Sequence, residues 1–288
     1  GFGSDLAHGC LVVKWIKGLF WQPVGVLART GCFGLTIARH QGGQRRFWYA
    51  QTMNSSIADN IARVRAQIQA ACQAAGRAPD SVQLLAVSKT WGPDAVRQAH
   101  AAGLTAFGEN YIQEAVDKIG ALKDLALEWH CIGPIQSNKT RLVAEHFDWV
   151  HTVDRLKIAE RLSAQRPEHL PPLHICIQVN IDGGPTKSGV APAEALDLAR
   201  AVAKLPRLVV RGLMSIPDHA PEFEAQLAIH TSAKRLFDQI SALGEPGLGK
   251  FDTLSLGMTA DLEAAIQAGS TLVRVGTGVF GGRTYPAA

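Results

Sequence analysis

The sequence predicts an α/β protein built as a single (β/α)8 TIM-type barrel with an extra N-terminal helix. Short apolar runs alternate with amphipathic helical patterns, and eight such units follow one another within residues 53–288. This alternation implies parallel strands joined by right-handed crossovers. A barrel of eight units typically needs about 250 residues, which this stretch nearly supplies. An open doubly wound sheet is the alternative.

The predicted barrel is preceded by one helix. Ser56 is a good N-cap residue, and Asp59 follows in the first turn, where a carboxylate is favourable. Gly76 ends the pattern. The apolar residues between these signals recur at helical spacing: Ile57, Ile61, Val64, Ile68 and Cys72.

Eight apolar runs have the length of buried parallel strands. They cover residues 82–87, 106–108, 129–132, 149–152, 174–179, 209–214, 253–256 and 272–275. Seven amphipathic helical patterns lie between and beside them, in residues 93–102, 111–119, 139–146, 155–165, 191–205, 221–243 and 261–268. Each helix can therefore connect one strand to the next, as a barrel requires.

Residues 1–52 differ in composition from the rest of the chain. They hold three of the six tryptophans, a strong excess of Lys and Arg over acids, and no clear periodicity. We expect a non-native or poorly ordered extension, with the native start at Met53 and one domain over residues 53–288. An organelle transit peptide is the alternative.

Composition excludes several function classes. The formal charge of +4 is concentrated in residues 1–52, so the main body is close to neutral and has no basic stripe for nucleic acid. The sequence has no run of eighteen apolar residues, so we expect no membrane-spanning helix. Five cysteines without CxxC spacing predict free thiols in a reducing, cytoplasmic compartment. The ten histidines show no metal-ligand spacing, and we expect no metal site.

Lys89 is the most informative residue. In a barrel, chemistry gathers where strands end, and Lys89 follows the first predicted strand. A lysine is seldom buried, and burial favours the neutral amine, which is a nucleophile toward aldehydes. Lys89 is therefore a candidate Schiff-base lysine for pyridoxal 5'-phosphate, PLP. The alternative is a lysine that extends into solvent at a strand end.

The loop after the last strand is rich in glycine. It reads Gly-Thr-Gly-Val-Phe-Gly at 276–281, a formal GxGxxG pattern. Only seven residues follow Gly281 in this sequence, so we do not expect the acidic ribose-binding residue that a dinucleotide site has about 20 positions later. Barrels often bind phosphate with the loops after strands seven and eight. Gly276 lets the backbone approach the phosphate, and Thr277 and Thr259 can add hydroxyl donors. Simple tight turns are the alternative.

Two further polar residues stand at strand ends. Arg274 interrupts an apolar strand, and if it points inward it needs an acceptor such as a pyridine nitrogen. An arginine donor would leave that ring nitrogen neutral and weaken its action as an electron sink. The alternative is an ion pair with a helix carboxylate. Asn110 can bond a cofactor's phenolic oxygen or cap the helix that is predicted to begin at Tyr111.

Several motifs resemble one family in order along the chain. They include Ala-Val-Ser-Lys at 86–89, Phe-Gly-Glu-Asn-Tyr at 107–111, Lys-Ser-Gly at 187–189 and Val-Arg-Val-Gly-Thr at 273–277, with longer matches at 129–139, 212–217 and 254–261. On these motifs the chain resembles the PLP homeostasis protein family, which is similar to the N-terminal barrel domain of bacterial alanine racemase.

The resemblance implies PLP as cofactor and assigns residues to it. Lys89 would hold PLP as a Schiff base, Asn110 would lie near the phenolic oxygen, and Arg274 would lie at the pyridine nitrogen. The remaining implied contacts are to the phosphate and the ring: Thr259, Gly276 and Thr277 for the phosphate, Met214 for the ring. The family usually has Ser at position 259 and Met at position 256, where this chain has Thr259 and Leu256.

The resemblance also implies a function. We expect a PLP-binding protein of vitamin B6 homeostasis that affects amino-acid and keto-acid balance without established catalysis. PLP and PLP-dependent apo-enzymes are the expected partners of a cytoplasmic monomer. A racemase of low activity is the alternative, but we expect the second domain of alanine racemase, which supplies a catalytic tyrosine from the partner subunit, to be missing. A barrel that binds another phosphorylated metabolite is a third reading.

Overall fold

A computed structural model describes residues 56–184, 187–218 and 220–282 of the chain. The predicted extension at 1–52 lies outside the described residues. Within them, eight parallel strands form a closed barrel in sequence order. The strands are β1 (Gln83–Val87), β2 (Ala106–Glu109), β3 (Glu128–Cys131), β4 (Trp149–Val153), β5 (Leu173–Gln178), β6 (Leu208–Met214), β7 (Thr253–Ser255) and β8 (Leu272–Val275).

The pairing of the first strand with the last closes the barrel. β1 pairs with β2 on one side and with β8 on the other, with Leu85 opposite Arg274. The barrel prediction is therefore confirmed, and the alternative of an open sheet is wrong. Each predicted strand agrees with the observed one to within one residue at either end.

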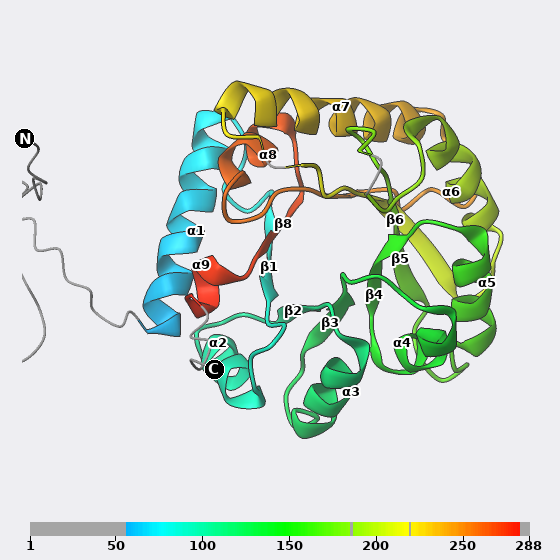
Figure 1. Ribbon diagram of the computed structural model, residues 1–288, viewed down its shortest axis with the longest axis horizontal. Coiled ribbons are helices and arrows are strands. Elements are labelled where there is room, and N and C mark those ends of the chain that lie inside the picture. Colours follow the sequence, from blue (N-terminus) through cyan, green and yellow to red (C-terminus); the bar gives the residue numbers. More distant parts are fainter. Residues whose placement is uncertain (1–55, 185–186, 219, 283–288) are drawn as a thin grey trace, which may run out of the picture. The chain divides into compact units, whose positions relative to one another are not determined.

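Helices form an outer ring around the strands (Figure 1). They are α1 (Ile57–Ala74), α2 (Pro93–Ala101), α3 (Ile112–Ala121), α4 (Thr140–His146), α5 (Leu156–Gln165), α6 (Ala195–Ala203), α7 (Phe223–Ala242), α8 (Leu262–Ala268) and α9 (Thr277–Phe280), with 3-10 turns η1 (Ser137–Lys139) and η2 (Pro192–Glu194). The extra helix, α1, precedes the first strand and packs against α8 and α9.

The start of α1 follows the sequence signal. The Ser56 hydroxyl accepts a hydrogen bond from the Asp59 backbone N–H at 3.1 Å, and the Asp59 carboxylate accepts one from the Ser56 N–H at 3.2 Å. This reciprocal capping box satisfies two donors that the helix itself leaves open. The prediction of a helix capped by Ser56 is confirmed.

Two local features differ from the prediction. The helix predicted over 191–205 is shorter, because a 3-10 turn that begins at Pro192 precedes α6. The glycine-rich loop after β8 forms one helical turn, α9, which the sequence did not predict. Glycine lowers helix propensity, but here it permits close packing. A Cβ on Gly278 would lie 3.2 Å from Val64 Cγ2 of α1.

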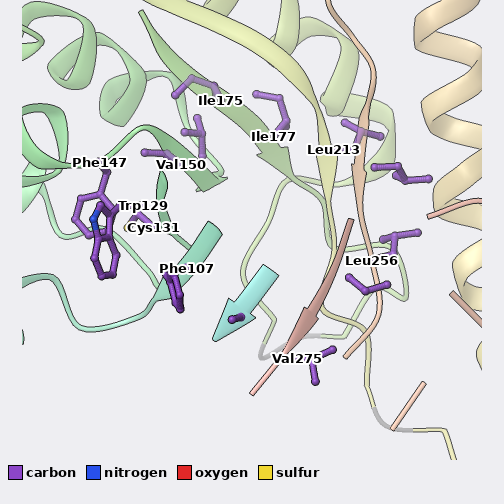
Figure 2. Packing of buried hydrophobic residues seen from close by; sticks show 14 of the residues in the cluster. Phe107, Trp129, Cys131, Phe147, Val150, Ile175, Ile177, Leu213, Leu256 and Val275 are labelled. Carbon is purple, nitrogen blue, oxygen red and sulfur yellow. The ribbon is translucent and has the colours of Figure 1, made fainter. Parts of the chain in front are cut away.

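Apolar side chains fill the layer between the strands and the surrounding helices. Figure 2 shows residues of this cluster from several strands: Phe107, Trp129, Val150, Ile175, Ile177, Leu213 and Val275. Side chains alternate across a strand, so the neighbours of these residues face the inside of the barrel. That inner set is partly polar: His130, Trp149, His151, Cys176, Met214, Ser255 and Arg274.

No helix in the described part of the chain is both long and apolar enough to cross a membrane. Among the same residues, His, Cys, Asp and Glu nowhere gather in a group of three or more that could hold a metal ion.

We predict that Ser56→Ala destabilises the protein by about 1 kcal/mol, because the α1 cap loses its side-chain acceptor. Urea unfolding measures the change. Ser232→Ala is the control, since the Ser232 hydroxyl bonds only the Ala228 carbonyl of its own helix. Equal stability of the two variants would contradict a role for the cap.

Candidate functional site

A cavity of about 350 Å³ opens where the strands end at their carboxyl side. We call it the mouth pocket, and its volume falls in the range of small-molecule sites. Six of the seven predicted site residues line it: Lys89, Asn110, Thr259, Arg274, Gly276 and Thr277. Its other described lining residues are Val87, Trp91, Ile132, Ile216, Met258, Ala260 and Gly281.

Lys89 follows the end of β1 and is partly buried. Its neighbours in the chain are held by their own contacts. The Ser88 hydroxyl donates to Glu109 Oε1 at 2.6 Å. The Thr90 backbone N–H donates to Glu114 Oε1 at 2.7 Å, and Thr90 has a φ of 68°. A positive φ is strained for threonine, so the bond to Glu114 helps to hold this turn.

A buried lysine, Lys118, connects the two carboxylates that hold Ser88 and Thr90. Lys118 Nζ donates to Glu109 Oε1 at 2.6 Å, to Glu114 Oε1 at 3.1 Å and to the Ser88 carbonyl at 2.8 Å. Its side chain is 3% exposed and that of Glu109 is fully buried. We call Ser88, Glu109, Glu114 and Lys118 the lysine clamp. It fixes the backbone on both sides of Lys89.

The lysine clamp has a defined charge balance. Burial raises the pKa of Glu109, and the adjacent Lys118 ammonium opposes this rise. The pair is stable only because each charge faces the other, since an unpaired buried charge costs several kcal/mol. Sequence reasoning missed the clamp. The only signal was the i,i+4 spacing of Glu114 and Lys118, which usually indicates an exposed pair.

Arg274 is buried inside the barrel and reaches the mouth pocket. Its Nη1 donates to the Ser255 carbonyl and to Ser255 Oγ, both at 2.7 Å, and its Nη2 donates to the Ser215 carbonyl at 2.9 Å. Burial lowers the pKa of Arg274 to about 10, so the guanidinium remains charged at neutral pH. The alternative of an ion pair with a helix carboxylate is wrong among the described residues, since the hydrogen-bond partners of Arg274 there are two carbonyls and a hydroxyl.

Asn110 lines the mouth pocket and carries an unsatisfied acceptor. Its Oδ1 is buried and has no hydrogen-bond partner in the described part of the chain. The alternative that Asn110 caps a helix is wrong, because α3 begins at Ile112 with Tyr111 as N-cap and no side-chain cap. Asn110 packs closely against Gly133. A side chain at position 133 would prevent this approach, because its Cβ would lie 2.3 Å from the Asn110 carbonyl oxygen.

Hydroxyls and a glycine lie at the rim formed by the last two loops. Thr277 Oγ1 donates to Thr259 Oγ1 at 3.4 Å, and both residues are exposed. Gly276 lies against β1, where a Cβ would be 3.4 Å from the Val87 carbonyl oxygen. This rim can donate hydrogen bonds to an anion that enters beside Lys89.

Met214 is placed differently from the other predicted residues. It is fully buried and packs with Trp149 and Cys176 inside the barrel, and it is not among the described lining residues of the mouth pocket. Ile216, two positions later, packs against this cluster and lines the pocket instead. Sequence reasoning also missed Trp91, whose ring stacks on Phe280 at 5.8 Å. A tryptophan just after the first strand was the available signal.

Fold and site together define a class: a (β/α)8 barrel with a lysine, an arginine and a rim of two threonines and a glycine around one pocket at the carboxyl ends of its strands. The sequence profile of the family described as "Alanine racemase, N-terminal domain" matches residues 59–284. The "Pyridoxal phosphate homeostasis protein" of Pseudomonas aeruginosa is 59% identical over 233 residues, which is 81% of this chain and 98% of that protein. The chain belongs to the pyridoxal phosphate homeostasis protein family, within the alanine racemase N-terminal domain group.

Solved structures show the same similarity. A protein of unknown function from Bifidobacterium adolescentis superposes with a TM-score of 0.74 at 34% identity, covering 78% of this chain and 94% of that one. PipY of Synechococcus elongatus PCC7942, solved with PLP bound, superposes with a TM-score of 0.68 at 37% identity, covering 78% of this chain and all of PipY.

We predict that Lys118→Ala destabilises the protein by about 3–5 kcal/mol, because Glu109 is left buried without its counter-charge. The pKa of Glu109 in the folded variant then rises further above its unfolded value. At low pH, protonation of Glu109 stabilises the folded variant. The loss of unfolding free energy relative to the unaltered protein is therefore smaller there, and it grows as pH rises through the folded pKa of Glu109. Urea unfolding at pH 5 and pH 8 measures both effects.

Lys234→Ala is the control for this experiment. Lys234 also pairs with a carboxylate one helical turn away, Asp238, but the pair is exposed. Such pairs contribute well under about 1 kcal/mol. A Lys118 variant as stable as the Lys234 variant would show that the clamp does not hold the Lys89 loop.

Proposed function

We propose that this chain binds PLP in the mouth pocket, with Lys89 as the lysine that holds it as a Schiff base. The observation that carries the proposal is that one cavity of about 350 Å³ is lined by a lysine, a buried arginine, an amide side chain and two threonines. PLP supplies an aldehyde with which a neutral lysine amine condenses.

The residues present fit the chemistry of PLP. Asn110 Oδ1 is a buried acceptor without a partner, and it suits the phenolic hydroxyl of the cofactor. Arg274 uses at most three of its five N–H donors on described residues, so donors remain for the pyridine nitrogen. Thr259, Thr277 and Gly276 offer hydroxyl and backbone donors to the phosphate.

The relatives support the same cofactor and role. The similar protein of Pseudomonas aeruginosa is named a pyridoxal phosphate homeostasis protein, and PipY was solved with PLP bound. We infer from this that the chain keeps PLP available in vitamin B6 homeostasis and affects amino-acid and keto-acid levels. PLP-dependent apo-enzymes are the proposed acceptors.

We propose storage and delivery of PLP in place of turnover. A guanidinium at the ring nitrogen keeps that nitrogen neutral, which weakens the ring as an electron sink. A racemase also needs a second acid or base. Tyr111 is the single tyrosine among the described residues, and it is 55% exposed at the start of α3. A racemase of low activity remains the competing function.

The remaining expectations are part of the proposal. We propose a cytoplasmic monomer with one barrel domain over residues 53–288; the expected extension at 1–52 lies outside the described residues. The free, buried thiols Cys72, Cys131 and Cys176 support a reducing compartment.

We predict that Lys89→Ala abolishes the imine absorbance of the PLP-loaded protein while it stays folded, because the condensing amine is removed. Visible absorbance and borohydride trapping with mass spectrometry measure the attachment. Lys187→Ala is the control, since Lys187 also follows a barrel strand but pairs with Asp218 at 2.7 Å. Loss of absorbance in the control alone would assign the attachment to Lys187 and overturn our assignment.

We predict that the PLP-loaded protein produces no D-isomer from L-alanine or L-serine in multiple turnovers. Chiral chromatography of the amino acids after prolonged incubation measures this. Steady turnover that depends on Lys89 would establish the racemase function instead. A protein that remains colourless with added PLP would favour a different phosphorylated ligand.

A further inference from the structure

A line of hydrogen bonds crosses the inside of the barrel. Glu128 Oε1 lies 2.8 Å from His130 Nε2, and His130 Nδ1 lies 2.9 Å from His151 Nε2. His151 Nδ1 lies 3.0 Å from Ser255 Oγ, and Ser255 Oγ lies 2.7 Å from Arg274 Nη1. The line starts at the amino end of β3 and ends at the mouth pocket.

We propose that these five side chains form a one-way relay in which Ser255, His151 and His130 are positioning residues for Arg274. The relay aims the guanidinium and thereby sets the donors that remain for a ligand in the mouth pocket. This inference rests on the proposed function, because it concerns how the pocket is prepared for the nitrogen of a PLP ring.

The two ends fix the direction of the relay. Arg274 can only donate hydrogen bonds. Glu128 can only accept them when it is ionised, and the hydrogen bond from His130 lowers the pKa of Glu128 to about 2. With both histidine rings neutral, every group between them must therefore accept on the Arg274 side and donate on the Glu128 side.

This direction determines the state of each intermediate group. Ser255 Oγ accepts from Arg274 and has one proton, which it donates to His151 Nδ1. His151 must then carry its proton on Nε2 and donate to His130 Nδ1, and His130 must carry its proton on Nε2 and donate to Glu128. Burial lowers the pKa of both histidines, which keeps the rings neutral as this pattern requires.

Neighbouring residues hold the histidine rings in place. The His130 ring stacks on Trp149 with centroids 5.3 Å apart, and the His151 ring lies 5.9 Å from the same indole. Both histidines are fully buried. The rings cannot turn without disturbing this packing, so Ser255 is held in the orientation that fits Arg274.

The relay decides which donors of Arg274 reach the pocket. Its Nη1 is committed to Ser255, both to the hydroxyl and to the carbonyl, and Nη2 bonds the Ser215 carbonyl. Without the Ser255 hydroxyl, Nη1 would have a free donor, and the guanidinium could rotate about its long side chain. A ligand nitrogen in the mouth pocket would then meet a less ordered donor.

The first experiment uses the unaltered full chain with 15N-labelled histidine, without and with PLP. Long-range 1H–15N correlation spectra report the protonated nitrogen of each ring, and His130→Gln and His151→Gln assign the signals. We expect both rings to be neutral with the proton on Nε2 in both samples. A proton on Nδ1, or a charged ring, at either position would overturn the relay.

The second experiment compares two fully buried serines. Ser255→Ala breaks the relay, whereas Ser270→Ala removes a hydroxyl that bonds only the carbonyls of Leu254, Leu256 and Leu272. We expect Ser255→Ala to raise the Kd for PLP by about tenfold or more. Ser270→Ala should change it by less than about twofold. Melting temperatures of the PLP-free proteins record the structural effect of each change.

The outcomes separate the two proposals. If the unaltered protein binds PLP and both serine variants bind it equally well, the relay has no positioning role while the proposed function stands. If the unaltered protein binds no PLP, the proposed function fails, and the histidine spectra of the PLP-free protein still decide whether the relay exists.

Discussion

The site depends on the parallel pairing of β1 with β8. This pairing sets Leu85 opposite Arg274, although these residues come from opposite ends of the barrel sequence. It brings the lysine that follows β1 beside the glycine loop that follows β8, where a Cβ on Gly276 would be in contact with the Val87 carbonyl oxygen. An open sheet would leave Lys89 and Arg274 on opposite edges. Closure therefore creates the pocket as well as the core.

Alternation of side chains then divides the strands into two environments. The outward residues, such as Phe107 and Val150, pack against the helices and supply the apolar burial that stabilises the fold. The inward residues are free to be polar, and His130, His151 and Ser255 use this freedom. A barrel interior is usually filled with branched apolar side chains. Here part of that space holds hydrogen-bonded groups that end at the mouth pocket.

Much of the barrel and part of the pocket lining could be predicted from the sequence. Strand positions followed from continuous apolar runs, and Lys89 and Arg274 were conspicuous because a charge at or in such a run is rare. Both line the pocket. The lysine clamp was not predictable, since Lys118 and Glu109 meet only after α3 packs beside β2. The His130–His151 contact likewise depends on the β3–β4 register, which pairs His130 with Trp149. Helix α9 was not predicted, because its glycine-rich sequence is typical of a loop.

Lys118 and Arg274 illustrate how burial and the choice of partners set the role of a cation. Lys118 faces carboxylates, so its charge is neutralised locally and serves to hold the Lys89 loop. Arg274 donates hydrogen bonds to carbonyls and a hydroxyl, which are uncharged and do not neutralise the guanidinium. Its positive field therefore extends into the pocket, where it favours an acceptor nitrogen and disfavours a protonated one. In the proposed PLP complex, a ring nitrogen that accepts a hydrogen bond from Arg274 would stay neutral and lack the electron demand of a pyridinium, which would favour retention of PLP over chemistry on it.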